Sequence, residues 1–189
     1  MDRREALKSV ALLLGGTVIG AEMFLQAGCK PASKSVSDLF QADNVAYLNE
    51  IAETILPETS TPGAKAAKVG EFMGVMVRDC YTPEDQQVFV EGLTKVNDAS
   101  EKMYSKKFME LDAKQRTALL TSLDVEQRKY AEDKEEGQPN HYFRMMKELT
   151  LLGYFTSEVG ATKALRYLPV PGRYDGCMPY KKGDKAWAT

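Results

Sequence analysis

The sequence is poor in the residues from which most catalytic and metal sites are built. Its 189 residues include a single histidine, His141, and only three cysteines. One histidine does not make a zinc or di-iron site unless several carboxylates converge on it, and no Glu-x-x-His pattern occurs. His141 stands at the expected start of a helix, where a surface or capping role is the usual one.

Motifs for nucleotides, haem and nucleophilic catalysis are also missing. The chain has no Gly-rich phosphate or dinucleotide loop and no Cys-x-x-Cys-His sequence for covalent haem. A serine nucleophile requires a base held beside it, and no nucleophile-elbow pattern is present. Acid pairs such as Glu132-Asp133 lie in a charged stretch that is typical of a solvated loop. The sequence therefore predicts no catalytic residue, no metal site and no cofactor bound by this chain.

The overall composition is that of a soluble globular protein. Hydrophobic residues make up 43% of the chain and charged residues 28%. The length favours one domain with a sizeable core. The net charge is −2 and the basic residues are scattered, which argues against a nucleic-acid partner.

The N-terminus has the features of a targeting segment. A positively charged start precedes an apolar run from Val10 to Ala21, and the small residues Ala27-Gly28-Cys29 follow. Twelve helical residues span about 18 Å, which is too short for a hydrocarbon core of about 30 Å. We therefore expect residues 1–29 to be a signal and not a permanent membrane span.

The signal resembles the twin-arginine export motif, which carries folded cargo. Asp2 and Ala6 depart from that motif, whereas four residues fit it: Arg3, Arg4, Leu7 and Lys8. An ordinary secretory signal is the alternative. Either route predicts a periplasmic protein.

The three cysteines each leave two interpretations open. Cys29 follows Leu25-Gln26-Ala27-Gly28, which resembles a lipoprotein cleavage site with its leucine one place early. Cys29 is then either a lipidated anchor or a residue near an ordinary cleavage site. Cys80 and Cys177 remain after export, and an oxidising compartment favours a disulfide between them. Their alternative role is that of two small buried hydrophobic residues.

The rest of the chain reads as a short linker, residues 30–40, followed by one helical domain, residues 41–189. Thr82-Pro83 and Asp112 with Gln115 are strong helix-start signals, and Asn140 is the expected cap of the fifth helix. That helix carries Phe143, Met146, Leu149 and Leu152 at a spacing of three. No window alternates at period two, and helices are expected over about 43–56, 65–80, 82–103, 112–132, 140–152 and 156–165. The fold class is therefore all-α: an irregular bundle of five to six helices with a long irregular C-terminal tail.

The tail, residues 168–189, contains three prolines and three glycines but also several aromatic residues. Disordered segments are poor in aromatics, so we expect the tail to be ordered against something. Its rings either cover the helix over 140–152 or bind another protein. Tyr, Trp and Arg are enriched at interface hot spots, and the candidates for a partner interface are Tyr154, Phe155, Arg166, Tyr167, Arg173, Tyr174, Tyr180 and Trp187.

Several stretches together resemble one family. With the twin-arginine start, they are Ile51–Thr59, Thr61–Ala64, Asp79–Gln86, Leu151–Glu158 and Pro171–Gly176. As a set they are similar to the gluconate 2-dehydrogenase subunit 3 family, in the form found in Bacteroidetes-type bacteria. None of these motifs has a chemical meaning by itself.

The resemblance implies a small, non-catalytic subunit. Its partner would be a large flavoprotein of the glucose–methanol–choline type, which holds FAD and oxidises sugars or sugar acids. A multihaem cytochrome c often completes such complexes, and the large subunit is exported together with the small one. The large subunit also sets the substrate. The alternative is a free-standing exported helical binding protein or enzyme with an unrecognised site.

Overall fold

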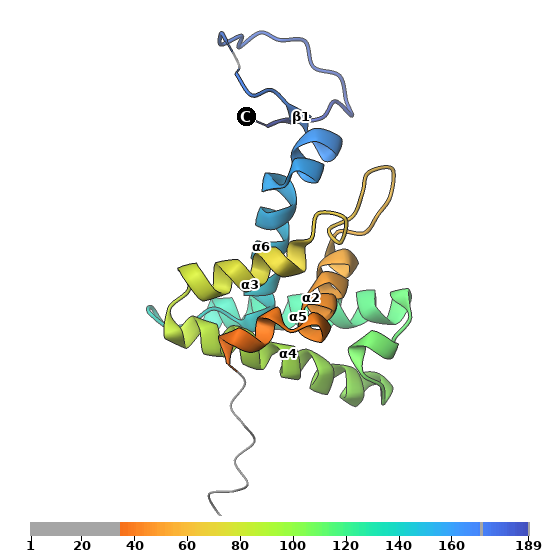
Figure 1. Ribbon diagram of the computed structural model, residues 1–189, viewed down its shortest axis with the longest axis vertical. Coiled ribbons are helices and arrows are strands. Elements are labelled where there is room, and N and C mark those ends of the chain that lie inside the picture. The colour runs from red at the N-terminus through yellow and green to blue at the C-terminus, as the bar shows by residue number, and fades with distance from the viewer. Residues whose placement is uncertain (1–34, 171, 189) are drawn as a thin grey trace, which may run out of the picture. The chain divides into compact units, whose positions relative to one another are not determined.

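The computed structural model describes residues 35–170 and 172–188, and the expected all-α class is confirmed (Figure 1). The described residues form five long helices: α2 (Ala42–Ile55), α3 (Val69–Cys80), α4 (Pro83–Tyr104), α5 (Ala113–Asp133) and α6 (Tyr142–Thr156). Short elements complete them: η1 (Val36–Phe40), η2 (Phe108–Glu110), the π-helical turn η3 (Gly160–Ala164), β1 (Arg166–Tyr167) and β2 (Trp187–Ala188).

Local capping chemistry determines where two of the helices begin. The Thr82 side chain accepts a hydrogen bond from the backbone nitrogen of Asp85 at 3.2 Å, and Pro83 occupies the first position of α4. At α5, Asp112 accepts from the Gln115 nitrogen at 2.9 Å, and Gln115 accepts from the Asp112 nitrogen at 3.2 Å. Both expected start signals are confirmed.

Three element boundaries differ from the expected ones. The helix expected from residue 65 begins at Val69, because Lys68 has a φ of 53° and interrupts the helical backbone. The linker expected over 30–40 includes η1, in which Leu39 is buried, so the folded part begins earlier. The short helix expected over 156–165 is reduced to η3, while α6 continues to Thr156.

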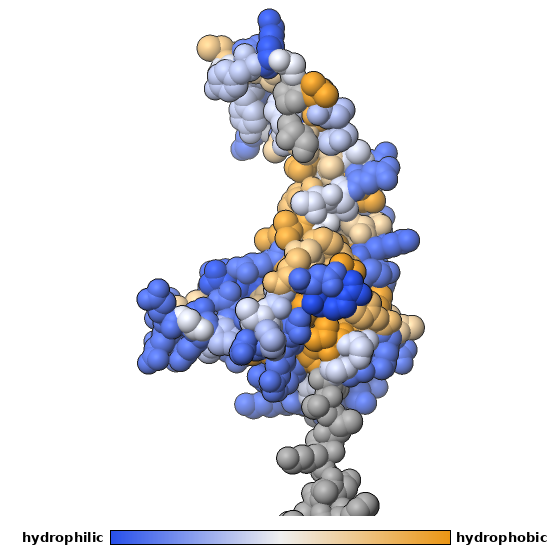
Figure 2. Space-filling view, turned by 60° about the vertical axis from the view of Figure 1, so that its left-hand side comes forward, coloured by the Kyte–Doolittle hydropathy of each residue, from blue (hydrophilic) through white to orange (hydrophobic). Residues whose placement is uncertain are grey.

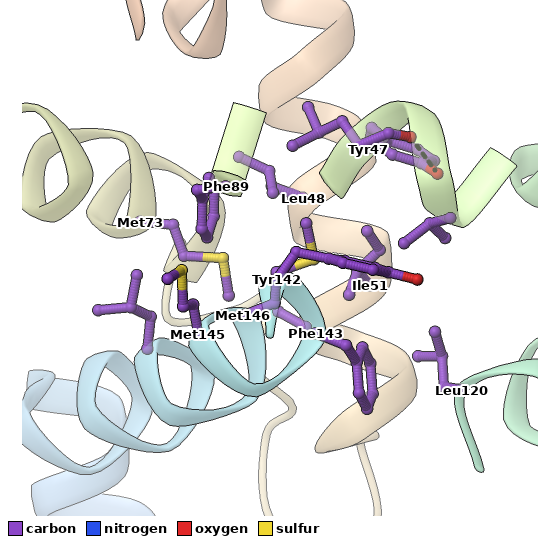
Figure 3. Packing of buried hydrophobic residues seen from close by; sticks show 14 of the residues in the cluster. Tyr47, Leu48, Ile51, Met73, Phe89, Leu120, Tyr142, Phe143, Met145 and Met146 are labelled. Carbon is purple, nitrogen blue, oxygen red and sulfur yellow. Dashed lines mark hydrogen bonds between the residues drawn. The ribbon is translucent and has the colours of Figure 1, made fainter. Parts of the chain in front are cut away.

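Helix α6 lies among the other four helices and supplies much of the core (Figures 1 and 3). Figure 3 shows Met145 and Met146 of α6 beside Met73 of α3 and Phe89 of α4. Burying a side chain of this size contributes about 1.5–3 kcal/mol. Two glycines allow the close packing: a Cβ on Gly92 would lie 2.7 Å from Cβ of Tyr142, and one on Gly153 would lie 2.6 Å from the Phe72 ring.

An ion-pair network joins α2 to α5 at the edge of this core. The Glu50 carboxylate contacts the Arg116 guanidinium and, at 2.5 Å, Nζ of Lys65. Arg116 also donates to the backbone carbonyls of Phe108 at 3.2 Å and Met109 at 2.9 Å. Burial raises the pKa of Glu50, but the hydrogen bond from Lys65 and the charge of Arg116 outweigh it, and the net shift is downward. Glu50 is therefore ionised at neutral pH and holds the two helices together.

The C-terminal residues form a closed loop rather than a further helix. Strands β1 and β2 pair in parallel, with Arg166 opposite Trp187 and Tyr167 opposite Ala188. We call Arg166–Ala188 the C-terminal arm and residues 35–165 the helical body. Every described residue from Tyr167 to Trp187 is exposed.

Within the described ranges, no helix combines the length and the apolar character needed to cross a bilayer.

Candidate partner interface

His141 has a structural role at the start of α6. Its Nδ1 accepts a hydrogen bond from the Phe143 nitrogen at 3.3 Å, so His141, and not the expected Asn140, caps the helix. The ring is 9% exposed, and its Nε2 lies 3.5 Å from Oε1 of Glu126. Burial lowers the pKa of His141, although the Glu126 carboxylate partly offsets this. The expected capping role of His141 is confirmed, whereas the expected surface position is wrong because the ring is buried.

The described part of the chain offers no cluster of three or more histidine, cysteine or acidic residues that could hold a metal ion. Its two cysteines, Cys80 and Cys177, are both free and exposed. The structure therefore has neither the expected disulfide nor the alternative of two buried thiols. Cys29 and the export motif Arg3, Arg4, Leu7 and Lys8 lie outside the described residues, so they stay predictions.

Tyr154 does not belong to the interface candidates, because it is part of the core. Its side chain is 4% exposed, and its hydroxyl donates a hydrogen bond to the Pro62 carbonyl at 2.6 Å. This bond fixes the loop between α2 and α3 against the end of α6. The neighbouring Phe155 is 39% exposed and borders a pocket of about 280 Å³ whose lining also includes Leu56 and Pro62.

The outer face of α6 exposes apolar side chains that the sequence pattern assigned to the core. Leu152 was expected in the buried stripe but is 45% exposed, and Leu151 beside it is also exposed. The reason is geometric: at about 100° per residue, the nine steps from Phe143 to Leu152 turn the helix by half a revolution beyond two full ones. Figure 2 shows hydrophobic residues reaching the surface next to hydrophilic ones.

A clasp at the base of the arm holds its two ends together. The Arg166 nitrogen donates to the Ala186 carbonyl and the Leu168 nitrogen to the Ala188 carbonyl, both at 2.8 Å. The Arg166 guanidinium lies 4.3 Å from the centre of the Trp187 ring, a cation–π contact. Arg166 and Trp187, which were predicted as interface residues, therefore also hold the two ends of the arm together.

The arm presents most of the remaining interface candidates to solvent. Tyr174 is 96% exposed, Tyr180 76% and Tyr167 49%, and the side chain of Arg173 is 88% exposed. Of the two alternatives for the tail, the one in which these rings cover the helix over 140–152 is wrong, because exposure of this size leaves the rings uncovered. The arm instead surrounds a hollow of about 920 Å³ whose lining includes Tyr174, Tyr180 and Trp187.

Comparison with known proteins identifies the family and no individual relative. No curated protein and no solved structure matches the chain significantly. The family described as Gluconate 2-dehydrogenase subunit 3 matches over residues 42–172. The match covers α2 to α6 and ends inside the Pro171–Gly176 stretch, so most of the arm lies beyond it. On this match, which spans more than half of its length, the chain belongs to the gluconate 2-dehydrogenase subunit 3 family, and with it to the accessory subunits of dehydrogenase complexes.

Proposed function

We propose that the chain is the non-catalytic small subunit of a periplasmic flavoprotein dehydrogenase of the glucose–methanol–choline type. The complex would act on sugars or sugar acids, with FAD in the large subunit and haem c in a third subunit where one is present. The family supports an accessory subunit of a dehydrogenase complex. The observation that carries the docking of a partner subunit is the arm, a closed loop of exposed aromatic and basic side chains.

The arm has the physical properties of a docking element. Tyrosine and arginine bury a large area while keeping a polar group for hydrogen bonds, and they are enriched at interface hot spots. The clasp and the prolines Pro169 and Pro179 restrict the free arm, which lowers the conformational entropy lost on binding. A stable interface buries about 800 Å² on each partner, so the exposed residues Leu151, Leu152 and Phe155 of α6 would extend the contact beyond the arm.

Export and assembly would be coupled through this contact. The twin-arginine route accepts folded cargo, so a signal on the small subunit would carry a bound large subunit that lacks one. Replacing Arg3 and Arg4 with lysine should leave both subunits in the cytoplasm. Lipidation of Cys29 would anchor the exported complex to a membrane on the periplasmic side, whereas cleavage without lipidation would release the complex into the periplasm.

Truncation after Leu168 tests the docking role. The chain would be co-expressed with a flavoprotein of the glucose–methanol–choline type from the same genome. We expect the truncated subunit to lose co-purification of the flavoprotein while its helical circular dichroism and melting temperature stay close to those of the full chain, because the removed residues are exposed.

Truncation after Leu168 also removes β2 and with it the clasp, so a second variant is needed that leaves the clasp intact. The Tyr174→Ala, Tyr180→Ala double variant is this matched control. It keeps β2 in place and removes two exposed rings, so it should weaken binding without unfolding anything. A truncated subunit that still binds the flavoprotein normally would contradict the docking role, and one that unfolds would place the arm in the core.

A further inference from the structure

The arm and the helical body carry net charges of opposite sign. Residues 35–165 contain 15 basic and 22 acidic residues, a net charge of −7. Residues 166–188 contain five basic and two acidic residues, a net charge of +3. The chain's overall charge of −2 conceals this separation. An acidic surface would therefore be repelled by the body and attracted by the arm.

Three of the arm's five positive charges, those of Arg173, Lys181 and Lys182, are available to a partner, whereas Arg166 and Lys185 make contacts at the base of the arm. Lys181 and Lys182 are exposed, and neither has an ion pair within the described ranges. Arg173 lies at the outer limit of an ion pair, 3.9 Å from Asp175. The second acid, Asp184, accepts a hydrogen bond from the backbone nitrogen of Lys181 at 2.9 Å and so forms a turn.

The same segment combines these charges with apolar surface. Val170 and Tyr180 are each 76% exposed, and Tyr180 lines the hollow together with Met178, Pro179 and the other aromatic rings. A purely electrostatic contact would need only the cations. The combination fits a surface on which carboxylates surround a protruding apolar side chain.

We propose that the arm binds an acidic surface of the flavoprotein subunit and selects that subunit by charge. Carboxylates of the partner face Arg173, Lys181 and Lys182, and an apolar side chain of the partner enters the hollow. This inference rests on the proposed function. The family match ends at residue 172, so Lys181 and Lys182 lie beyond the matched residues.

The test compares two charge reversals of equal size in the full-length mature chain. The arm variant carries Lys181→Glu and Lys182→Glu. The control carries Lys114→Glu and Lys129→Glu, two exposed positions on α5 for which the structure gives no ion pair. Binding to the purified flavoprotein used for co-expression is measured at about 0.1 M and about 1 M salt, between which the Debye length falls from about 10 Å to about 3 Å.

At the lower salt we expect the arm variant to bind about tenfold more weakly than the native chain, and the control to bind as well as or slightly worse than the native chain. At the higher salt the difference between arm variant and native chain should shrink to about threefold or less. Circular dichroism of all three proteins checks that they are folded equally.

Three other results would each overturn the inference in a distinguishable way. Equal binding of the arm variant and the native chain would rule out selection by charge and leave the proposed function intact. If the native chain does not bind the flavoprotein at either salt, both the selection by charge and the proposed function are ruled out. Vesicles of phosphatidylglycerol and phosphatidylcholine give the third: if they bind the native chain but not the arm variant, while flavoprotein affinity is the same for both, the arm recognises a membrane surface instead.

Discussion

The helical body and the C-terminal arm of this chain differ in where they place their large side chains. In the body, α6 contacts four other helices and buries most of its large side chains, whereas every described residue from Tyr167 to Trp187 is exposed. The body coincides with most of the family match, and most of the arm lies beyond it. The buried core thus lies within the matched residues, and most of the exposed aromatic and basic residues of the arm lie beyond them.

The largest effect should come from exchanging aromatic rings for alanine in the two regions. Phe89 is fully buried on α4, so Phe89→Ala removes apolar contacts and leaves a cavity. We expect a loss of about 3–5 kcal/mol in the free energy of unfolding, measured by urea titration. Tyr174→Ala in the arm should change it by less than about 0.5 kcal/mol. A comparable loss from both variants would mean that the arm contributes to the core.

A smaller effect is expected where the two regions join, at η3. A Cβ on Gly160 would lie 1.9 Å from the Tyr154 carbonyl oxygen, which is backbone and cannot turn aside. Gly160→Ala should therefore cost about 1–3 kcal/mol, as overpacking does.

Gly176→Ala is the matched control for that substitution, because its Cβ would meet only the exposed ring of Tyr174 at 3.1 Å. It should be nearly neutral in the same urea titration. If Gly160→Ala is also neutral, the turn relaxes at no cost and does not fix the arm's starting point.

The smallest effect is a pH dependence that only the body can show, because the chain's one histidine lies there. Burial lowers the pKa of His141 in the folded state, with an opposing effect of Glu126 and a further lowering by Lys95. The unfolded chain then binds more protons than the folded one between the two pKa values, so stability rises with pH. It should be complete above about pH 6.5 and decrease as the pH falls below that value.

His141→Asn sharpens this prediction, since asparagine can cap a helix but does not titrate there. Thermal melting between about pH 5 and pH 7.5 should show a decline at low pH for the native chain and a flatter profile for the variant. Identical profiles would assign the pH dependence to other groups. The arm's exposed aromatic rings should fluoresce alike in both proteins.

The sequence predicted best what depends on near neighbours along the chain. The starts of α4 and α5 followed from Thr82-Pro83 and from Asp112 with Gln115, because each cap joins residues only three positions apart. The all-α class followed from the same local periodicity. The family resemblance was also recognised from the sequence, and the match over residues 42–172 confirms it.

What the sequence did not predict depends on contacts between distant residues or on accumulated helix geometry. Tyr154 resembled a surface aromatic, yet its hydroxyl binds the carbonyl of Pro62, far away in the chain. Leu152 belongs to an apolar series at a spacing of three, which drifts around a helix of 3.6 residues per turn. A pattern in which spacings of three and four residues alternate follows one face of a helix. It would have assigned Leu149, which is buried, to the core face and left Leu152 outside it.

The clasp between β1 and β2 also bears on how the arm can change over evolutionary time. Arg166 and Trp187 hold the loop closed at its base, so residues can be inserted or deleted between them without displacing either end. Loop closure becomes only about 0.6 kcal/mol costlier for each doubling in length. A duplicated gene could therefore acquire a longer, shorter or differently charged loop while keeping α2 to α6 unaltered, and so pass to a new dehydrogenase without first losing its fold.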